Sequence, residues 1–209
     1  MMMSRRSAML ALALVLPLAG CKIVPMADQA SAPAAGFDAA SYVQGIWSDQ
    51  ALPYFTENAR PITQVWPAIA TDLAAAGTDF GYRSGEGSPW SFIVSGSGTV
   101  AAKNTESRAG TLDVTVEGLP DPVVVQIGPV VRGNAVRDAL PFVSFQDFTN
   151  QIEYANAGKA LTATAAEGVA QNIEAIAVGD VVEFIGAVSL AGSSDRLQVT
   201  PVTLEKTAP

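Results

Sequence analysis

Apolar residues recur at helical spacing in two segments of the first half of the chain. Asp38 is placed to cap a short helix that Pro53 interrupts, with apolar positions at Tyr42, Val43, Ile46 and Trp47. A second helix is expected after Pro61, with Gly77 as its end. Its apolar residues fall on one face, at steps of three and four: Ile62, Val65, Trp66, Ile69 and Leu73. Both helices are therefore expected to pack against the rest of the domain.

From Trp90 onward, alternation of apolar and small polar residues predicts strands. The three expected strands cover 90–100, 112–116 and 123–131. A helix-like stretch is expected to start near Asp147, although Gly158 and Gly168 weaken it. Its apolar face is formed by Tyr154, Leu161, Ala165, Val169 and Ile173. Two further strands are expected over 181–190 and 197–204.

Three strands, a helix and two strands are the order of an OB-fold, a small Greek-key barrel. Glycines inside the first and fourth strands, at 96, 98 and 186, suit the sharp bends of such a barrel. The sequence therefore predicts an α+β, mainly β fold: an OB-like five-stranded barrel over 90–205 with an N-terminal helical extension over 37–77. The five strands should carry Val94, Val114, Val125, Val182 and Val199.

The first twenty residues have the features of a signal peptide. Arg5 and Arg6 precede an uncharged run over 8–19 that is too short to span a bilayer as a helix. The run ends in Leu18-Ala19-Gly20-Cys21, which is typical of a lipobox, where the cysteine thiol takes a diacylglyceryl group. We therefore expect a lipoprotein signal peptide at 1–20 and a lipid on Cys21 that anchors the protein to a membrane in the periplasm. The alternative is an ordinary signal peptide with an incidental cysteine.

The residues after Cys21 predict a short tether. Lys22, where some lipoproteins have Asp, favours the outer membrane by similarity to lipoprotein sorting in Gram-negative bacteria. The stretch up to residue 36 is rich in Ala, Pro and Ser and shows no apolar face. As a flexible coil its fifteen residues span about 20 Å. We expect the lipidated cysteine and tether at 21–36 and a single domain at 37–209.

Composition limits the possible functions. Cleavage before Cys21 removes both leader arginines, so ten basic residues would remain against twenty acidic ones. A chain this acidic repels phosphate backbones, so nucleic acid is not an expected partner. The chain has no histidine, and its one cysteine is assigned to lipidation. Metal sites of the usual His/Cys kinds and His-dependent nucleophile pairs are therefore excluded. No cofactor is expected, no catalytic motif is found, and the protein is not expected to be an enzyme.

Polar residues are densest over 127–154. Arginine grips a carboxylate or phosphate at two points, and two of the ten remaining basic residues lie here. The candidate ligand- or partner-binding residues are Arg132, Arg137, Asp138, Asn150, Gln151 and Tyr154. In the alternative, structural interpretation, Arg132 or Arg137 pairs with Asp138 or Asp147 and braces the mouth of the barrel, and Asp147 or Thr149 caps the following helix. The spacing of these residues in the sequence does not distinguish a binding site from the structural interpretation.

A family resemblance rests on several of these segments. They are Lys22-Ile23-Val24 after the lipobox, Tyr42-Val43-x-x-Ile46-Trp47, Gly-Pro-Val-x-Arg-Gly-x-Ala-x-Arg-Asp at 128–138, Phe145-x-x-Phe148-x-Asn150-Gln151 and Thr200-Pro201-Val202. The chain resembles the predicted periplasmic lipoproteins of domain of unknown function 2291. The resemblance carries over no activity and no catalytic residue. It implies an accessory role in carbohydrate uptake, with a sugar ABC importer or its solute-binding protein as partner.

Three functions from different classes remain open. The first is a lipid-anchored binding or accessory module that contacts a transporter, its solute-binding protein or a small ligand. The second is a structural envelope lipoprotein that only packs against other envelope components. The third is a hydrolase that uses two carboxylates, which needs no histidine. A cleft with two carboxyl groups about 5–10 Å apart would favour the third.

Overall fold

The computed structural model describes residues 36–192 and 197–207. The expected signal peptide at 1–20, Cys21 and the tether up to residue 35 lie outside the described residues, so the expectations for them remain predictions. Gly36–Pro209 forms a compact unit.

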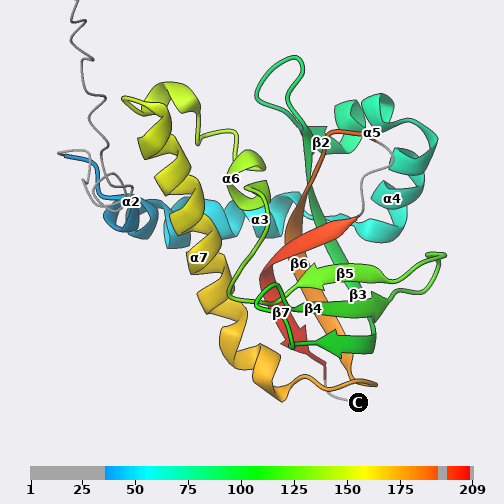
Figure 1. The fold of residues 1–209 in the computed structure, drawn as a ribbon. Helices are drawn as coiled ribbons and strands as arrows, with labels where there is room; N and C mark the ends of the chain where they lie inside the picture. Colours follow the sequence, from blue (N-terminus) through cyan, green and yellow to red (C-terminus); the bar gives the residue numbers. More distant parts are fainter. Residues whose placement is uncertain (1–35, 193–196, 208–209) are drawn as a thin grey trace, which may run out of the picture. The chain divides into compact units, whose positions relative to one another are not determined.

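Five strands close into a small barrel (Figure 1). They are β3 (Trp90–Asn104), β4 (Thr111–Thr115), β5 (Val123–Gln126), β6 (Val181–Leu190) and β7 (Gln198–Lys206). Neighbours pair in the order β3-β4-β5-β7-β6, and β3 pairs with β6 to complete the ring. The β5–β7 pair is parallel and the other four are antiparallel. The predicted OB-like barrel is confirmed, and each of the five expected valines lies on its own strand.

Glycines allow two pairs of strands to approach closely. A Cβ on Gly98 would lie 2.3 Å from the carbonyl oxygen of Thr115, and one on Gly186 would lie 2.5 Å from that of Thr200. The β6–β7 register also shifts at Gly186. Only a residue without a side chain fits such positions.

Two hydrophobic cores hold the domain together. One fills the barrel, with Val94, Leu112, Val125, Phe184 and Leu204 among its members. The other lies between the outer face of the barrel and the helices, and includes Phe55, Ile93, Leu140, Leu161 and Ala187. β3 contributes to both, because Phe92 and Val94 belong to the first core while Ile93 belongs to the second.

The helical extension differs from the prediction at three residues, Pro53, Asp72 and Gly77. It comprises α2 (Ala39–Ile46), a π-helical turn η1 (Trp47–Ala51), α3 (Leu52–Asn58), α4 (Ile62–Thr71) and α5 (Leu73–Phe80). Asp38 caps α2 as expected, accepting from Ala40 N at 3.0 Å. Pro53 does not interrupt the helix: it lies at the start of α3, directly after the π-helical turn η1, which continues the helical backbone from α2. The predicted helix after Pro61 divides at Asp72, which caps α5 through Ala74 N and Ala75 N.

The prediction for Gly77 was wrong. This residue is buried inside α5 rather than at a helix end. A Cβ here would lie 2.2 Å from the indole ring of Trp90. Gly77 therefore provides room for the tryptophan at the start of β3.

The long helix α7 (Gln151–Ala175) starts later than predicted. Its N-cap is Asn150, whose Oδ1 accepts from Ile152 N at 2.9 Å and Glu153 N at 3.0 Å. Asp147 instead closes the 3-10 turn η2 (Phe145–Asp147) by accepting from Ser144 N. Before this turn lies the short helix α6 (Ala135–Asp138). Two short strands, β1 (Arg60–Pro61) and β2 (Gly81–Tyr82), pair with β3 outside the ring.

Candidate functional site

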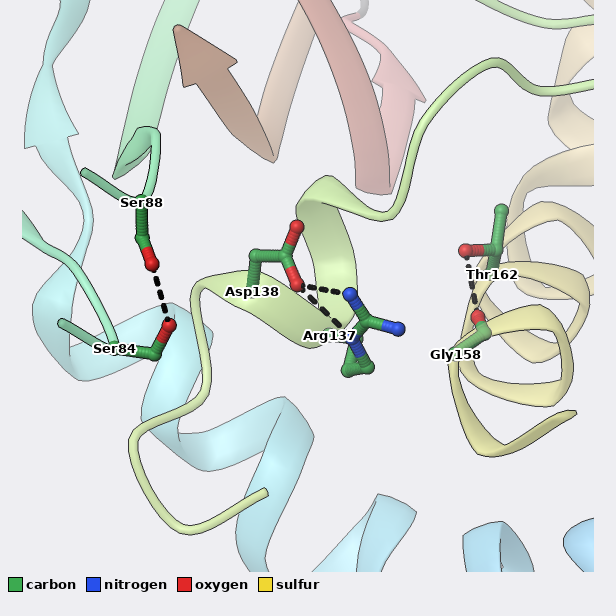
Figure 2. A network of polar contacts seen from close by, with 6 residues as sticks. All are labelled: Ser84, Ser88, Arg137, Asp138, Gly158 and Thr162. Atoms are coloured by element: carbon green, nitrogen blue, oxygen red, sulfur yellow. Dashed lines mark hydrogen bonds and ion pairs between the residues drawn. The ribbon is translucent and has the colours of Figure 1, made fainter. Parts of the chain in front are cut away.

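The structure brings together three of the six predicted site residues. Arg137 Nε and Nη2 donate to Asp138 Oδ1 at 2.9 and 2.6 Å. The guanidinium carbon of Arg137 lies 3.9 Å from the centroid of the Tyr154 ring. Figure 2 shows Arg137 and Asp138 on α6, with the guanidinium on the side of the α7 turn that carries Gly158. The Arg137 side chain is only 12% exposed, so the ion pair is largely sheltered from water.

Gly158 allows Arg137 to lie against α7. A Cβ on Gly158 would lie 3.1 Å from Arg137 Cδ and 3.0 Å from Asn134 Oδ1. This glycine lowers the intrinsic helical preference of α7, as the sequence indicated, and in return α6 approaches the helix closely.

Tyr154 contacts Arg137, and its pKa also depends on Tyr82. Burial raises the pKa of the Tyr154 phenol, the Arg137 guanidinium opposes that rise, and Asp138 and Tyr82 add to it. Burial also raises the pKa of Tyr54, again with a contribution from Tyr82. Tyr82 on β2 therefore contributes to the raised pKa both of Tyr54 on α3 and of Tyr154 on α7.

The other three predicted residues have different surroundings. The Asn150 side chain caps α7, and Gln151, the first residue of that helix, is exposed. Arg132 is exposed, and its backbone N–H donates to Oε1 of the buried Gln126 at 2.9 Å. Gln126 in turn donates to Thr200 Oγ1 at 3.0 Å. The Asn150 side chain and the Arg132 backbone therefore have local structural roles.

A polar pocket lies beside the Arg137–Asp138 pair and was not predicted. The cavity measures about 170 Å³, and Ala139, which follows the pair, forms part of its wall. Its polar lining residues are Tyr54, Asn58, Arg60, Asp79, Tyr82 and Ser91. We call it the Ser91 pocket. Ser91 is 2% exposed, and its hydroxyl has no hydrogen-bond partner. A buried hydroxyl without a partner is unusual, because losing water without replacement costs about 1–3 kcal/mol.

A larger cleft lies between α4 and the barrel. It measures about 660 Å³, and Glu117, Glu183 and Glu205 line it together with several hydroxyl side chains. Glu183 and Glu205 are register partners on β6 and β7. Directly opposite residues have Cβ atoms about 5 Å apart, so their charges repel. All three glutamates are exposed, and none is sheltered as the acid of a two-carboxylate hydrolase must be.

A third depression lies over β4 and β5, the strands that carry ligands in many OB-folds. Its lining includes Trp66, Asp113 and Asp121. Trp66 is half-buried against the barrel core, where the sequence had suggested a core position. Both carboxylates repel a phosphate backbone.

The described residues contain neither a candidate metal site nor a helix able to span a membrane. No group of three or more His, Cys, Asp or Glu side chains in 36–192 and 197–207 is arranged to hold a metal ion. Within the same ranges, no helix combines the length and the apolar character needed to cross a membrane.

Comparisons with known proteins support both the fold and the family. The chain is similar to a crystal structure of an OB-fold protein from Thermotoga maritima, with a TM-score of 0.67 and 19% sequence identity. The match covers 82% of this chain and 99% of that one, and at this identity it shows the fold alone. No curated protein matches the chain. A family model matches residues 11–205, and the chain belongs to that family, the predicted periplasmic lipoproteins of DUF2291.

Proposed function

We propose that this periplasmic lipoprotein is a lipid-anchored binding module whose Ser91 pocket takes a small polar ligand. The observation that carries the proposal is the buried Ser91 hydroxyl, which has no partner in the protein. A ligand hydroxyl or amine would supply the missing hydrogen bond. The family assignment supports the periplasmic location.

The lining of the Ser91 pocket favours a ligand that is neutral overall. Arg60 and Asp79 contribute one charge of each sign, while the two phenols, Asn58 and Ser91 both donate and accept hydrogen bonds. A volume near 170 Å³ has room for about five waters at their liquid volume, which suits a molecule of monosaccharide or amino-acid size. The expected link to sugar uptake makes monosaccharides the first probes.

Thermal denaturation with a panel of monosaccharides and amino acids tests the pocket. A ligand at about 100 times its Kd should raise the free energy of unfolding by about 2.7 kcal/mol. Ser91→Val, which fills the site with methyl groups, should abolish that rise. Ser97→Val, an exposed position on the same strand, should keep it. If no probe stabilises the wild type and Ser91→Val is the more stable protein, the hydroxyl is a packing imperfection and the proposal fails.

The lipid anchor on Cys21 and the accessory role need separate experiments. Cys21→Ala should give a product that takes up no labelled fatty acid, and continued labelling would refute the anchor. Fractionation of the wild type should place it in the outer membrane, as Lys22 favours. For the accessory role, crosslinking of the lipidated protein in its own membranes should capture a sugar importer or its solute-binding protein. Capture of envelope structural proteins alone would favour the structural alternative.

A carboxylate hydrolase is not proposed. The cleft that carries Glu117, Glu183 and Glu205 has the number of carboxyl groups such an enzyme needs. Each of them faces solvent, however, whereas an acid that must stay protonated at neutral pH requires shelter from water. We propose that the protein acts by binding.

A further inference from the structure

Two large apolar side chains are exposed at one end of α7. Phe145 on η2 is 46% exposed, and Ile152 in the first turn of α7 is 66% exposed. We call these two residues the apolar tip. Single exposed apolar residues are common, but a pair beside an aromatic cluster suggests an interaction surface.

The apolar tip lies close to the point where the tether joins the domain. The ring centroids of Phe145 and Tyr154 are 5.6 Å apart, those of Tyr154 and Phe148 are 5.4 Å apart, and those of Phe148 and Phe37 are also 5.4 Å apart. Three ring contacts thus connect the tip to Phe37, the residue that follows Gly36. Figure 1 shows the start of α7 and α2 on the same side of the barrel.

A second exposed pair lies beyond the other end of α7. Val178 is 62% exposed and Val181 is 42% exposed, and both follow the C-terminus of the helix. The 25 residues of α7 make it about 37 Å long. Fifteen residues separate Cys21 from Phe37, and a flexible chain of that length spans about 20 Å. With its lipid anchor at Cys21, the domain therefore brings the apolar tip close to the membrane more often than it brings Val178 and Val181 there.

We infer that the apolar tip rests on the surface of the bilayer that holds the lipid of Cys21. Exposed phenylalanine and aliphatic side chains bind by entering the boundary between headgroups and acyl chains. A weak contact is enough, because the tether keeps the domain at a high effective concentration next to the membrane. The inference rests on the lipid anchor proposed above and is independent of the Ser91 pocket.

The charge of the domain indicates that this contact is apolar rather than electrostatic. The mature chain would carry twice as many acidic as basic residues, and Asp147 is exposed on the same turn as Phe145. Anionic lipid repels such a surface. Docking should therefore be stronger on phosphatidylcholine vesicles than on vesicles that also contain phosphatidylglycerol.

Tryptophan quenching in vesicles tests the inference. The lipidated full-length product is reconstituted into phosphatidylcholine vesicles whose acyl chains are brominated near the headgroup. Phe145→Trp is compared with Val178→Trp, and the three native tryptophans give both variants the same background. We expect the added fluorescence of Phe145→Trp to be quenched and that of Val178→Trp to be unchanged. Adding Ile152→Asp to Phe145→Trp should relieve the quenching without unfolding the domain, because Asp is favoured in the first turn of a helix.

Each outcome decides between defined alternatives. Docking through the apolar tip is refuted if the two tryptophan variants are quenched equally. It is also refuted if Ile152→Asp does not relieve the quenching of Phe145→Trp. Flotation of the same samples reports on the anchor itself. If the protein does not float with the vesicles, the lipid anchor is refuted, and the inference with it. The Ser91 pocket is unaffected by either result.

Discussion

Lys103 connects the end of β3 to the end of α7 by hydrogen bonds, and replacing it should destabilise the domain. Its Nζ donates to the carbonyl oxygens of Ile173 and Ile176, both at 2.7 Å. These carbonyls belong to the last turn and the C-cap of α7, where backbone acceptors lack the usual partner four residues on, although Ile173 O also accepts from Ile176 N at 3.3 Å. A cation at this end also complements the negative pole of the helix dipole. Lys103→Met keeps the length of the side chain and removes all of these interactions.

The expected loss is about 2–3 kcal/mol of unfolding free energy. A hydrogen bond to a charged group contributes roughly 1.5–3 kcal/mol, and Lys103 makes two. Holding a lysine side chain in one conformation costs up to about 2 kcal/mol, which offsets part of that gain. In a domain of this size, 1 kcal/mol shifts Tm by about 2–4 °C. Lys103→Met should therefore lower Tm by roughly 4–12 °C.

Denaturant unfolding and hydrogen exchange measure the effect. Lys159→Met is the matched control, because Lys159 is exposed on α7 and should change stability by less than about 0.5 kcal/mol. Lys103→Gln should recover part of the loss by donating one neutral hydrogen bond. In Lys103→Met, the amides in the last turn of α7 should also exchange faster. A loss no greater than that of Lys159→Met would refute the reasoning.

Three further predictions concern stability. Gly98→Ala should lower the free energy of unfolding by about 1–3 kcal/mol, because the added Cβ meets the backbone of β4. Gly168→Ala should raise it by up to about 1 kcal/mol, because this glycine has open space around it on α7. Chemical denaturation measures both changes. Arg137→Ala should cost about 1–3 kcal/mol by leaving its half-buried carboxylate partner unpaired, and the exposed Arg132→Ala should cost little; equal thermal shifts would contradict this. Hydrogen bonds from the Lys206 ammonium and from the Ala177 backbone N–H lower the pKa of Asp180. Its contribution to stability is therefore present above the unfolded pKa near 3.9 and is lost as pH falls through the lower folded pKa. Asp180→Asn should make the free energy of unfolding less dependent on pH in that window.

The strands of the barrel were predictable because the alternation of apolar and polar residues along each strand does not depend on which elements pack against it. Val114 and Val125 mark β4 and β5 correctly, and the order of elements was enough to name the fold. Helix ends were harder, because several residues compete to cap them. Asp147 and Asn150 are both good caps, and only the path of the chain decides that Asn150 begins α7. Gly77 resembles a helix stop unless the position of Trp90 is known.

The candidate site was predictable only where it depends on neighbours in sequence. Arg137 and Asp138 are adjacent, so their pairing was among the alternatives. The Ser91 pocket could not be found in this way. Alternation of Ser91 with Phe92 is typical of a strand with one face in solvent, but the helices cover that face of β3. Tyr54 reaches the pocket from a helix distant in sequence, and Tyr82, the register partner of Ser91, lies on a two-residue strand that is too short for an alternation pattern to predict.

The path of β3 explains why a binding pocket would form at this end of the domain. The strand has 15 residues, and its first part pairs with β6 within the ring and with the short strand β2 at its other edge. Ser91 lies in this part of β3, between β2 and β6, so the position of its backbone is fixed. Residues of the helices and of short strands, such as Tyr54 and Tyr82, form the rim. A rigid floor with a rim from separate elements needs little reordering when a ligand binds, which keeps the entropic cost of binding low.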